Sequence, residues 1–488
     1  MQEIETPKNH TRNILRAFSY VAFCIYTIVA VIFSVVLVKF PILPLKFFLP
    51  IIILLVILDL IFIFFLFKKN TKNYVYLSCI IFELIFSALI GFAFYYFGHT
   101  ISFFDSIKPH DYQIEEYYVL VPEDSALTEI GEFSNHTLAT YDDYSENYQT
   151  ALRDLTQKIT PQIVSYENLS GAINAVVDGN TDAVFVKGTL AEIASDVFEN
   201  FDIDNYRILD IIKLQIKVDA VESGDVDITK DSFNILISGI DTYGDIATVS
   251  RSDVNIIVSV NPRTHKVLLT TVPRDYEVQL HGTTGLMDKL THAGLYGINM
   301  SIQTIEDLLG IDISYYLRIN FDSTIKLIDA LGGIEVTPDA TFYRPKYNCH
   351  FREGVTMHLD GSCALTYARE RKVYEFGDLH RIQNQQDILS AVINKLTTSK
   401  TLLTNYTNIL TSLSDSIETN IPSDQFYRFI NMQLDQMPSW NIERNAVEGT
   451  EIHVPTYTIP DRALFVFEQN PDSIIKASIM ISEVLAEN

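Results

Sequence analysis

Three long apolar stretches open the chain and set a membrane part apart from a polar remainder. They cover residues 17–38, 47–67 and 74–97, and each has about twenty residues, enough for a helix to cross a hydrocarbon core. The first stretch is too long for the apolar core of a signal peptide, and two further stretches follow it. Residues 1–100 are therefore predicted to form a membrane region with three spans.

Basic residues set the predicted orientation of these spans, because cytoplasmic segments carry an excess of lysine and arginine. Such residues precede the first span and lie between the second and third: Lys8, Arg12, Arg16, Lys68, Lys69 and Lys72. The N-terminus is then cytoplasmic, and three crossings place the rest of the chain outside the cell. We predict a multi-pass cell-membrane protein with a large extracellular C-terminal region.

Two carboxylates interrupt the apolar spans. Asp59 lies nine residues before Lys68 and Glu83 ten residues after Asn73, so at about 1.5 Å per helical residue both lie at a similar depth. We predict a protonated or hydrogen-bonded pair that holds the second and third spans together, with a proton relay as the alternative.

The remainder is too long for one core, so two extracellular domains are expected. Within residues 110–220, short apolar runs predict strands at 117–121 and 183–186, and helical spacing predicts helices near 148–159, 169–176 and 190–197. This pattern is typical of a small α/β module. It contains no glycine-rich phosphate loop, metal-ligand spacing or nucleophile motif, so an accessory binding or positioning role is expected.

The second extracellular domain, residues 231–488, begins with three buried strands at 233–238, 254–260 and 267–272. In an up-down-up meander, the end of the first strand, the start of the second and the end of the third share one edge. That edge gathers Asp241, Arg251, Asp253 and Arg274. Two carboxylates there suit a hard cation and two arginines suit its anionic ligand, while a salt-bridge cluster at the sheet rim is the alternative.

Planar donors gather again further along the chain. Arg369 and Arg371 share a face if their segment is extended, and Arg381 and Gln385 lie one turn apart on a helix predicted at 379–396, pointing partly inward. A solvated charge run is the alternative for residues 369–372. Because guanidinium groups bind phosphate oxygens in pairs, the four side chains predict a phosphate receptor.

Charge and cysteine content narrow the partners. Residues 1–100 hold eight Lys and Arg against four Asp and Glu, whereas the remaining 388 residues hold 28 against 57, within a net charge of −25. So acidic an exterior repels nucleic acid, and no nucleic-acid partner is expected.

Cys349 and Cys363, the two cysteines outside the spans, either form a disulfide or remain two free thiols.

A series of motifs from about Asp231 onward carries a family resemblance. In order they read NILISGID, RSD, VPRD, KLTHA, RINF, DALGGIEV, LDGSCALTYARER and GDLHRIQNQQ. Together they resemble the LytR-CpsA-Psr family of cell-wall glycopolymer transferases, and the spans with the α/β module further resemble its streptococcal capsule-locus members. The resemblance implies an α/β fold in which helices sandwich a mixed β-sheet, behind a three-helix transmembrane region and the accessory module.

The resemblance also implies an activity. The family transfers a polyprenyl-pyrophosphate-linked glycan, here a capsular polysaccharide, to peptidoglycan at the outer face of the membrane and releases polyprenyl phosphate. This implies a magnesium-dependent phosphotransferase, with manganese as a substitute and pyrophosphatase activity as a side reaction. Its partners would be the lipid-linked glycan, peptidoglycan, membrane lipid and capsule-assembly proteins, and the lipid would lie in an apolar tunnel between helices and the sheet.

Motif positions assign the roles that the resemblance implies. Asp241 and Asp253 would ligate magnesium, and Asp275 or Asp241 would accept a proton, with His292 a weaker candidate base. Arg274 would act in catalysis together with these carboxylates. The pyrophosphate would be bound by Arg251, Arg274, Arg369, Arg371, Arg381 and Gln385.

Two departures and two alternative functions remain. Val254 replaces the commoner Thr after RSD, and Asn384 replaces a frequent Arg, which is predicted to weaken one outer phosphate contact. The protein is alternatively a non-catalytic membrane regulator of capsule polymerisation or export that binds polyprenyl phosphates, or a polyprenyl-pyrophosphatase that uses water as acceptor.

Overall fold

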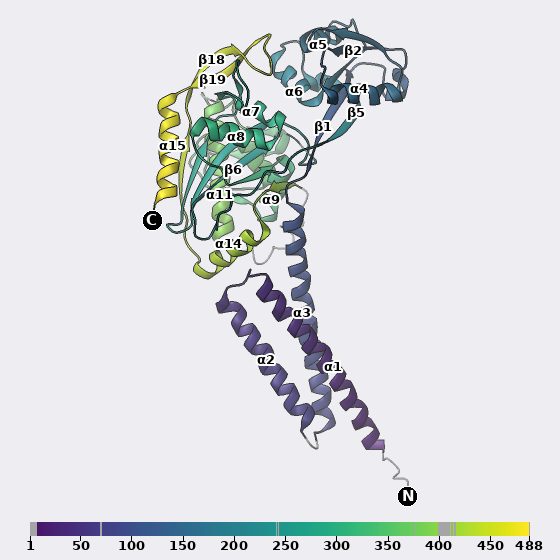
Figure 1. The fold of residues 1–488 in the computed structure, drawn as a ribbon, viewed down its shortest axis with the longest axis vertical. Helices are drawn as coiled ribbons and strands as arrows, with labels where there is room; N and C mark the ends of the chain where they lie inside the picture. Colours follow the sequence, from purple (N-terminus) through teal and green to yellow (C-terminus); the bar gives the residue numbers. More distant parts are fainter. Residues whose placement is uncertain are drawn as a thin grey trace.

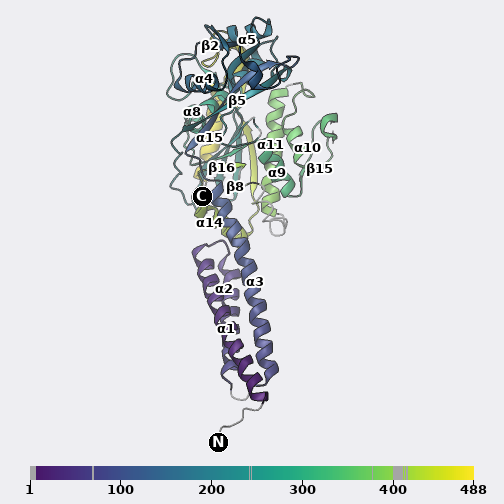
Figure 2. The same ribbon diagram turned by 90° about the vertical axis from the view of Figure 1, so that its right-hand side faces the viewer.

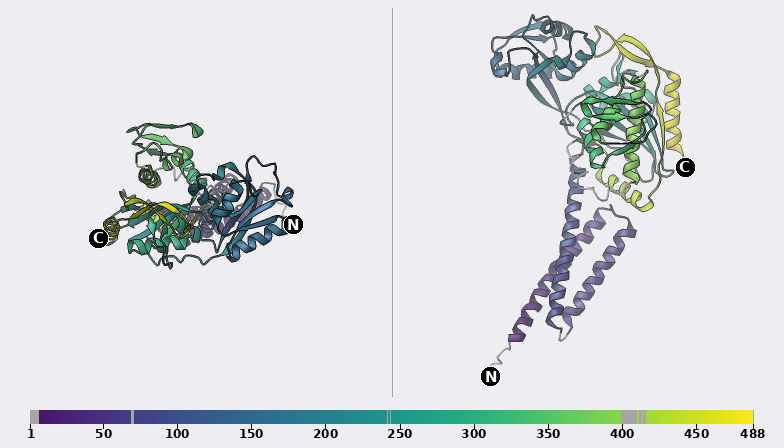
Figure 3. Two further views of the ribbon diagram at one scale, coloured as in Figure 1. Left: turned by 90° about the horizontal axis from the view of Figure 1, so that it is seen from above. Right: turned by 180° about the vertical axis from the view of Figure 1, so that it is seen from behind.

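The computed structural model has three parts: a bundle of three long helices, a domain built on a six-stranded sheet, and a smaller α/β module (Figure 1). It describes residues 7–68, 71–240, 242, 244–375, 377–398, 410, 413 and 416–487. The helix bundle holds the N-terminus at one end of the molecule, and the α/β module lies at the other end beside the sheet domain (Figures 1 and 3).

The helix bundle consists of α1 (Pro7–Lys39), α2 (Leu45–Phe67) and α3 (Asn73–Ser106). All three helices are long and apolar enough to cross a membrane. Many of their large apolar side chains face outward, where they are exposed in the isolated chain. Exposing such a surface to water costs free energy, whereas contact with lipid tails does not. The bundle therefore suits a membrane anchor.

The predicted pairing of Asp59 with Glu83 is wrong. The Asp59 carboxylate accepts a hydrogen bond of 3.0 Å from the Thr27 hydroxyl on α1. The two carboxyl oxygens of Glu83 are buried without a hydrogen-bond partner among the described residues. Spacing along the chain does not say how each helix is rotated about its axis, and this rotation decides which side chains meet.

The anchor is packed directly against the sheet domain. Phe104, near the end of α3, stacks on Phe426 of α14 (Ser423–Gln436) with ring centroids 4.8 Å apart. Phe40, which follows α1, meets Tyr427 of the same helix edge-to-face at 5.8 Å. The Lys46 ammonium of α2 lies 3.4 Å from the Asp435 carboxylate. α2, α3 and the residue that follows α1 therefore all contact α14.

The α/β module has a five-stranded sheet in the order β3-β2-β4-β1-β5, with helices between its strands. Its elements are β1 (Tyr112–Pro122), η1 (Ile130–Phe133), β2 (Thr137–Tyr141), α4 (Glu146–Lys158), β3 (Gln162–Tyr166), α5 (Leu169–Val177), β4 (Ala183–Lys187), α6 (Gly188–Val197), η2 (Ile203–Asn205) and β5 (Tyr206–Lys217). The strands and helices predicted here from periodicity all form, and β1 extends beyond its predicted ends.

The larger domain is built on a mixed six-stranded sheet in the order β16-β11-β6-β7-β8-β17. Its strands are β6 (Phe233–Ile240), β7 (Ser252–Asn261), β8 (Lys266–Thr271), β11 (Tyr315–Ile319), β16 (Ile417–Thr419) and β17 (Asn441–Ala446). β6, β7 and β8 run antiparallel in sequence, which confirms the predicted meander, whereas β11 and β17 join it in parallel.

Helices cover both faces of this sheet (Figure 2). One face packs on α8 (Ile298–Leu309) and α15 (Pro471–Ala486), and the other lies toward α9 (Phe321–Ala330), α10 (Gly361–Ala368), α11 (Gly377–Thr398) and α14. The remaining elements are β9 (Glu277–Val278), β10 (Asp288–Lys289), α7 (Leu290–Ala293), η3 (Gly294–Tyr296), β12 (Ile334–Val336), β13 (Phe342–Arg344), η4 (Pro345–Tyr347), β14 (Cys349–Phe351), β15 (Met357–Leu359), β18 (Gly449–Pro455) and β19 (Ala463–Gln469). The α/β fold class predicted from the sequence is confirmed.

A disulfide links Cys349 on β14 to Cys363 on α10, which settles the question that the sequence left open. It ties the β13–β14 hairpin to the helix that ends just before Arg369.

We expect the double variant C349S/C363S to lose about 2–4 kcal/mol of unfolding free energy. Denaturant unfolding with and without a reducing agent measures this, and C24S, which removes a free cysteine, is the control. Equal stability of the double variant and the parent would contradict it.

His110 links the anchor to the sheet domain in a pH-dependent way. Its Nδ1 lies 2.9 Å from the buried Glu418 carboxylate on β16, and this hydrogen bond raises the pKa of His110 above its ordinary value of 6.5. A raised pKa stabilises the fold below the unfolded value, and that contribution disappears as pH rises through the folded value.

We therefore expect the stability advantage of the parent over H110Q to be largest near pH 6 and to shrink at alkaline pH. Thermal unfolding midpoints of both proteins between pH 6 and 9 measure it, and a difference that does not change with pH would contradict the assignment.

Candidate functional site

An apolar cavity of about 520 Å³ lies between the six-stranded sheet and helices α9 and α11. Alternate residues of the strands point to the same face, so every second residue of β6 and β7 reaches it. The apolar lining residues include Ile235, Ile237, Ile256, Val258, Leu317 and Ile319 from the sheet, Leu327 and Ile328 from α9, and Ile388, Leu389, Val392, Ile393 and Leu396 from α11. Most of the cavity wall is therefore hydrocarbon.

The polar end of this cavity carries most of the site residues predicted from the sequence. Seven of them line it: Arg251, Asp253, Arg274, Arg369, Arg371, Arg381 and Gln385. We call the five guanidinium groups among them the arginine cluster. Asp275 lies just behind it, in contact with Arg274. Asp241, the ninth predicted site residue, lies outside the described residues.

Asp253 is the acidic centre of the cluster. Its Oδ2 accepts a 2.8 Å hydrogen bond from Nη1 of Arg274, and its Oδ1 accepts one of 2.9 Å from the Thr291 hydroxyl. Burial alone would raise the pKa of the Asp253 carboxyl, but the positive charges of Arg274, Arg251 and Arg381 outweigh burial and hold the pKa far below its usual range. Asp253 is therefore a carboxylate at any physiological pH.

Asp275 holds Arg274 from the other side. One of its oxygens accepts a 3.1 Å hydrogen bond from Nε of Arg274, and the other accepts a 2.9 Å bond from the Lys289 ammonium. Burial would raise the pKa of Asp275, but Arg274 and Lys289 outweigh it and the pKa is lowered. A carboxylate with two cationic partners is a weak base, so its geometry suits the positioning of Arg274 better than proton removal.

Arg369 and Arg371 reach the cluster from a tight turn rather than from an extended segment. α10 ends at Ala368, and Arg369 has helical backbone angles as the C-cap. The Arg369 guanidinium lies over the Phe321 ring, 4.3 Å from its centroid, which orients it toward the cavity. The backbone of Gly377 packs against the backbone of Arg371. A Cβ at position 377 would collide with the Arg371 carbonyl oxygen.

Sequence reasoning missed Glu370. The alternative of a solvated charge run does not hold for this residue, because its side chain is buried. Oε1 accepts hydrogen bonds from the backbone N–H groups of Arg371 and Lys372 at 3.0 and 2.8 Å, and Oε2 accepts from Nε of Arg344. Glu370 thus fixes the turn that presents the two arginines, a role that no sequence spacing indicates.

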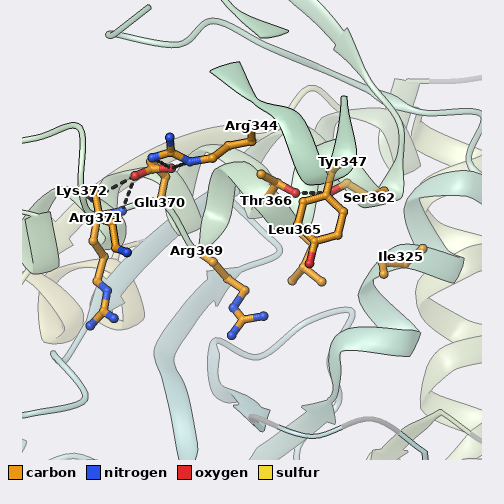
Figure 4. A pocket seen from close by; sticks show the side chains of 10 residues that line it. All are labelled: Ile325, Arg344, Tyr347, Ser362, Leu365, Thr366, Arg369, Glu370, Arg371 and Lys372. Atoms are coloured by element: carbon orange, nitrogen blue, oxygen red, sulfur yellow. Dashed lines mark hydrogen bonds and ion pairs between the residues drawn. The ribbon is translucent and has the colours of Figure 1, made fainter. Parts of the chain in front are cut away.

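A second depression of about 470 Å³ adjoins the arginine cluster at Arg369 and Arg371 (Figure 4). We call it the outer groove. Its residues are Ile325, Arg344, Tyr347, Ser362, Leu365, Thr366, Arg369, Glu370, Arg371 and Lys372. In the close view Arg344 turns toward Glu370, while Arg369 and Arg371 extend away from this pair. Leu365, Arg369 and Arg371 also line the apolar cavity, so the two spaces meet at the arginines.

A sequence profile of the LytR_cpsA_psr family matches residues 197–470, more than half of the chain. The chain belongs to this family. Its relatives include the polyisoprenyl-teichoic acid–peptidoglycan teichoic acid transferase TagU of Bacillus cereus ATCC 14579, 33% identical over 45% of this chain and 72% of the relative. TagU of Enterococcus faecalis V583 is 34% identical over 45% of this chain and 71% of its own.

Other relatives of the LytR_cpsA_psr family extend the comparison. TagU of Bacillus cereus AH820 is 33% identical, and the match covers 62% of its length. The crystal structure of Bacillus subtilis TagV is 29% identical, with a TM-score of 0.46 over 53% of this chain and 99% of that one. The family profile begins at residue 197, so the membrane helices and most of the α/β module lie outside it.

The expected metal site of this LytR_cpsA_psr family member is only partly described. Among the described residues, no group of three or more His, Cys, Asp or Glu could hold a metal ion alone. Asp253 nevertheless fits a magnesium ligand, because it is held ionised at the polar end of the cavity. Magnesium accepts one or two carboxylates together with substrate phosphate oxygens, so a full protein cage is not required.

Two further residues singled out from the sequence, His292 and Asn384, are both buried. His292 is buried, and its Nδ1 lies 2.6 Å from the Asp288 carboxylate, an arrangement that suits a structural pair. Asn384 is fully buried and donates from Nδ2 to the Tyr367 carbonyl at 3.1 Å. It joins α11 to α10 and does not line the cavity, and the predicted loss of a phosphate contact stays a prediction.

Proposed function

We propose that the protein transfers a glycan from a polyprenyl-pyrophosphate carrier to peptidoglycan and releases polyprenyl phosphate. The observation that carries the proposal is the apolar cavity that ends at the arginine cluster. A polyprenyl pyrophosphate has the matching shape, a long hydrocarbon joined to a compact anion. The names of the TagU relatives, transferases that act on a polyisoprenyl-linked polymer and peptidoglycan, support the same reaction class.

The apolar cavity and the arginine cluster would bind different parts of the carrier. Burying hydrocarbon in the cavity contributes about 0.8 kcal/mol for each CH₂ group, which favours a long isoprenoid chain. Guanidinium groups bind phosphate oxygens bidentately, so Arg274 and its neighbours would hold the pyrophosphate. Arg369 and Arg371 line both the cavity and the outer groove, which gives the glycan on the phosphate a way out into the outer groove.

The chemical step needs charge stabilisation more than covalent help. A sugar hydroxyl oxygen of peptidoglycan forms a bond to the glycan-bearing phosphorus, and the bond from that phosphorus to the bridging oxygen breaks. The electron pair leaves with polyprenyl phosphate, which takes up the hydroxyl proton through solvent. The arginines neutralise the negative charge on the phosphoryl oxygens, the dominant contribution in phosphoryl transfer.

A divalent cation would strengthen the same neutralisation. Asp253 would hold Mg²⁺, or Mn²⁺ in its place, together with phosphate oxygens, and Asp241 is the second proposed ligand. Such a cation would stabilise charge on the pyrophosphate.

The donor glycan is proposed to be a capsular polysaccharide, and the reaction to occur at the outer face of the membrane. The three spans and the accessory module support this assignment, because they resemble capsule-locus members of the family. Anchoring enzyme and lipid-linked donor to one membrane also raises their effective concentration. Capsule-assembly proteins are the proposed neighbours of the accessory module.

A reconstitution tests this function. Purified full-length protein in lipid nanodiscs, given a polyprenyl-pyrophosphate disaccharide and a peptidoglycan fragment, is expected to release polyprenyl phosphate and form a disaccharide–phosphate–peptidoglycan product. EDTA should lower the rate at least about 100-fold, and added Mg²⁺ or Mn²⁺ should restore it. Binding of the donor without any release would favour the regulator, and release without transfer would favour the pyrophosphatase.

A further inference from the structure

The arginine cluster also faces a third space, of about 210 Å³, on the side of the α/β module. We call it the vestibule. Ile193 and Val197 of α6 form one wall, and Leu464 and Phe465 of β19 form another. The polar lining is supplied by Asp275, Lys289, Thr291, His292, Arg251, Arg274 and Arg371.

The α/β module is held in place as a wall of the vestibule. Ile193 belongs to an apolar cluster with Leu295, Ile459 and Leu464 of the sheet domain. Arg462, at the tip of the β18–β19 hairpin, lies over the Phe198 ring of the module, 4.2 Å from its centroid. The hairpin reaches across to the module in both side views (Figures 1 and 3).

The module also contacts the arginine cluster itself. Glu192 of α6 places Oε2 3.9 Å from Nε of Arg251. Ser170 of α5 donates a 2.7 Å hydrogen bond to the Asp461 carboxylate of the hairpin, which adds a second polar tie between module and domain. The accessory module is therefore part of the surroundings of the proposed phosphate site.

The vestibule and the apolar cavity meet only at the arginines. Among the described residues, the two spaces share Arg251, Arg274 and Arg371 and no other lining residue. A phosphoryl group held by these three side chains has hydrocarbon-lined space on one side and the vestibule on another. In phosphoryl transfer the attacking and leaving oxygens lie roughly in line across the phosphorus. With the lipid phosphate leaving toward the cavity and the glycan in the outer groove, the vestibule is the space left at these arginines for the attacking oxygen.

We propose that the vestibule binds the acceptor, a sugar residue of a glycan strand, and that the accessory module shapes this acceptor site. This inference rests on the proposed transfer and adds the place from which its nucleophile comes. The vestibule is smaller than the roughly 300–1,000 Å³ pockets that hold drug-sized ligands, so it suits one sugar ring. Phe465 and Val197 offer an apolar surface for the ring face, and Lys289 and Asp275 offer polar partners for hydroxyl groups.

Narrowing the vestibule from the module side tests the proposal. We expect V197W to raise the KM for a peptidoglycan fragment about tenfold and to lower the ratio of transferred to hydrolysed donor by a similar factor. F465A, on the opposite wall, should shift the same ratio in the same direction by removing the surface for the ring. E199W is the matched control, because Glu199 is exposed two residues further on and does not line the vestibule.

The assay uses full-length protein in nanodiscs with a polyprenyl-pyrophosphate disaccharide, and it counts transferred and hydrolysed product separately. An unchanged acceptor KM in both V197W and F465A would overturn the acceptor assignment. An increase in the donor KM with no change in the product ratio would overturn it too, because it would place the donor in the vestibule. A parent protein that neither transfers nor hydrolyses the donor would remove the proposed function, and this inference with it.

Discussion

Replacing Arg274 with alanine is expected to lower the rate of polyprenyl phosphate release about 10³-fold. Arg274 lies between two carboxylates, bonded to Asp253 at 2.8 Å and to Asp275 at 3.1 Å, and it lines both the apolar cavity and the vestibule. Its removal takes away a hydrogen-bond donor to the phosphate oxygens. It also leaves the Asp253 carboxylate without its closest positive partner. The exposed carboxylate would then repel the pyrophosphate. Single-turnover release from a labelled donor measures the effect.

Arg263 provides the matched control for Arg274. It lies exposed in the turn between β7 and β8, at the opposite end of these strands from the cluster. R263A removes the same charge from the same sheet, so its rate should stay within about twofold of the parent. An R274A rate equal to that of R263A would contradict the role given to the arginine cluster.

Filling the apolar cavity is expected to remove long-chain lipid binding. Leu389 lines the cavity from α11 and is only half-buried, because part of its side chain faces the open space. In L389W the indole would occupy volume that isoprene units need. Each CH₂ group that is excluded costs about 0.8 kcal/mol, so we expect the affinity for a long polyprenyl phosphate to fall about 100-fold, or about 2.7 kcal/mol.

Chain length separates this effect from general damage. A carrier with two isoprene units should bind L389W and the parent almost equally, since it needs only the polar end of the cavity. Q383W places the same indole at an exposed position of the same helix and should behave like the parent with both carriers. Equal losses for short and long carriers in L389W would show that the cavity does not hold the lipid. Calorimetric titration of the three nanodisc-embedded proteins with both carriers gives the six affinities.

Much of the sheet domain followed from sequence patterns because strand direction constrains where strand ends meet. The meander of β6, β7 and β8 was predictable, and it brought Arg251, Asp253 and Arg274 to one edge as expected. The inward position of Arg381 and Gln385 followed from their row on an amphipathic helix. These predictions depend on local periodicity and chain direction, which the sequence carries.

The cavity lining was not predictable from the same patterns. Ile256 lines the cavity, whereas Ile257, its neighbour on β7, is buried against the helices on the other face. Both are apolar residues of one strand, and nothing in their identity says which face is left partly open. Only the spacing of α9 and α11 from the sheet decides it, and that spacing is a property of the folded domain.

The position of the accessory module was also beyond sequence reasoning. Its contacts use single residues far apart in the chain, such as Arg462 with Phe198, and neither residue belongs to a motif. Glu370 was misjudged for a related reason, because a charged residue within a run of charges is usually solvated. Here two backbone N–H groups and Arg344 supply the partners that allow its burial.

The fate of a labelled glycan tests the central claim most directly. In cells that carry this chain as their only member of the family, a radiolabelled glycan on its polyprenyl carrier can be followed into cell wall, lipid and medium fractions. Transfer predicts label in peptidoglycan with the parent and label retained on lipid with R274A. Label that stays on lipid with the parent, or that appears free in the medium, would contradict the transferase assignment.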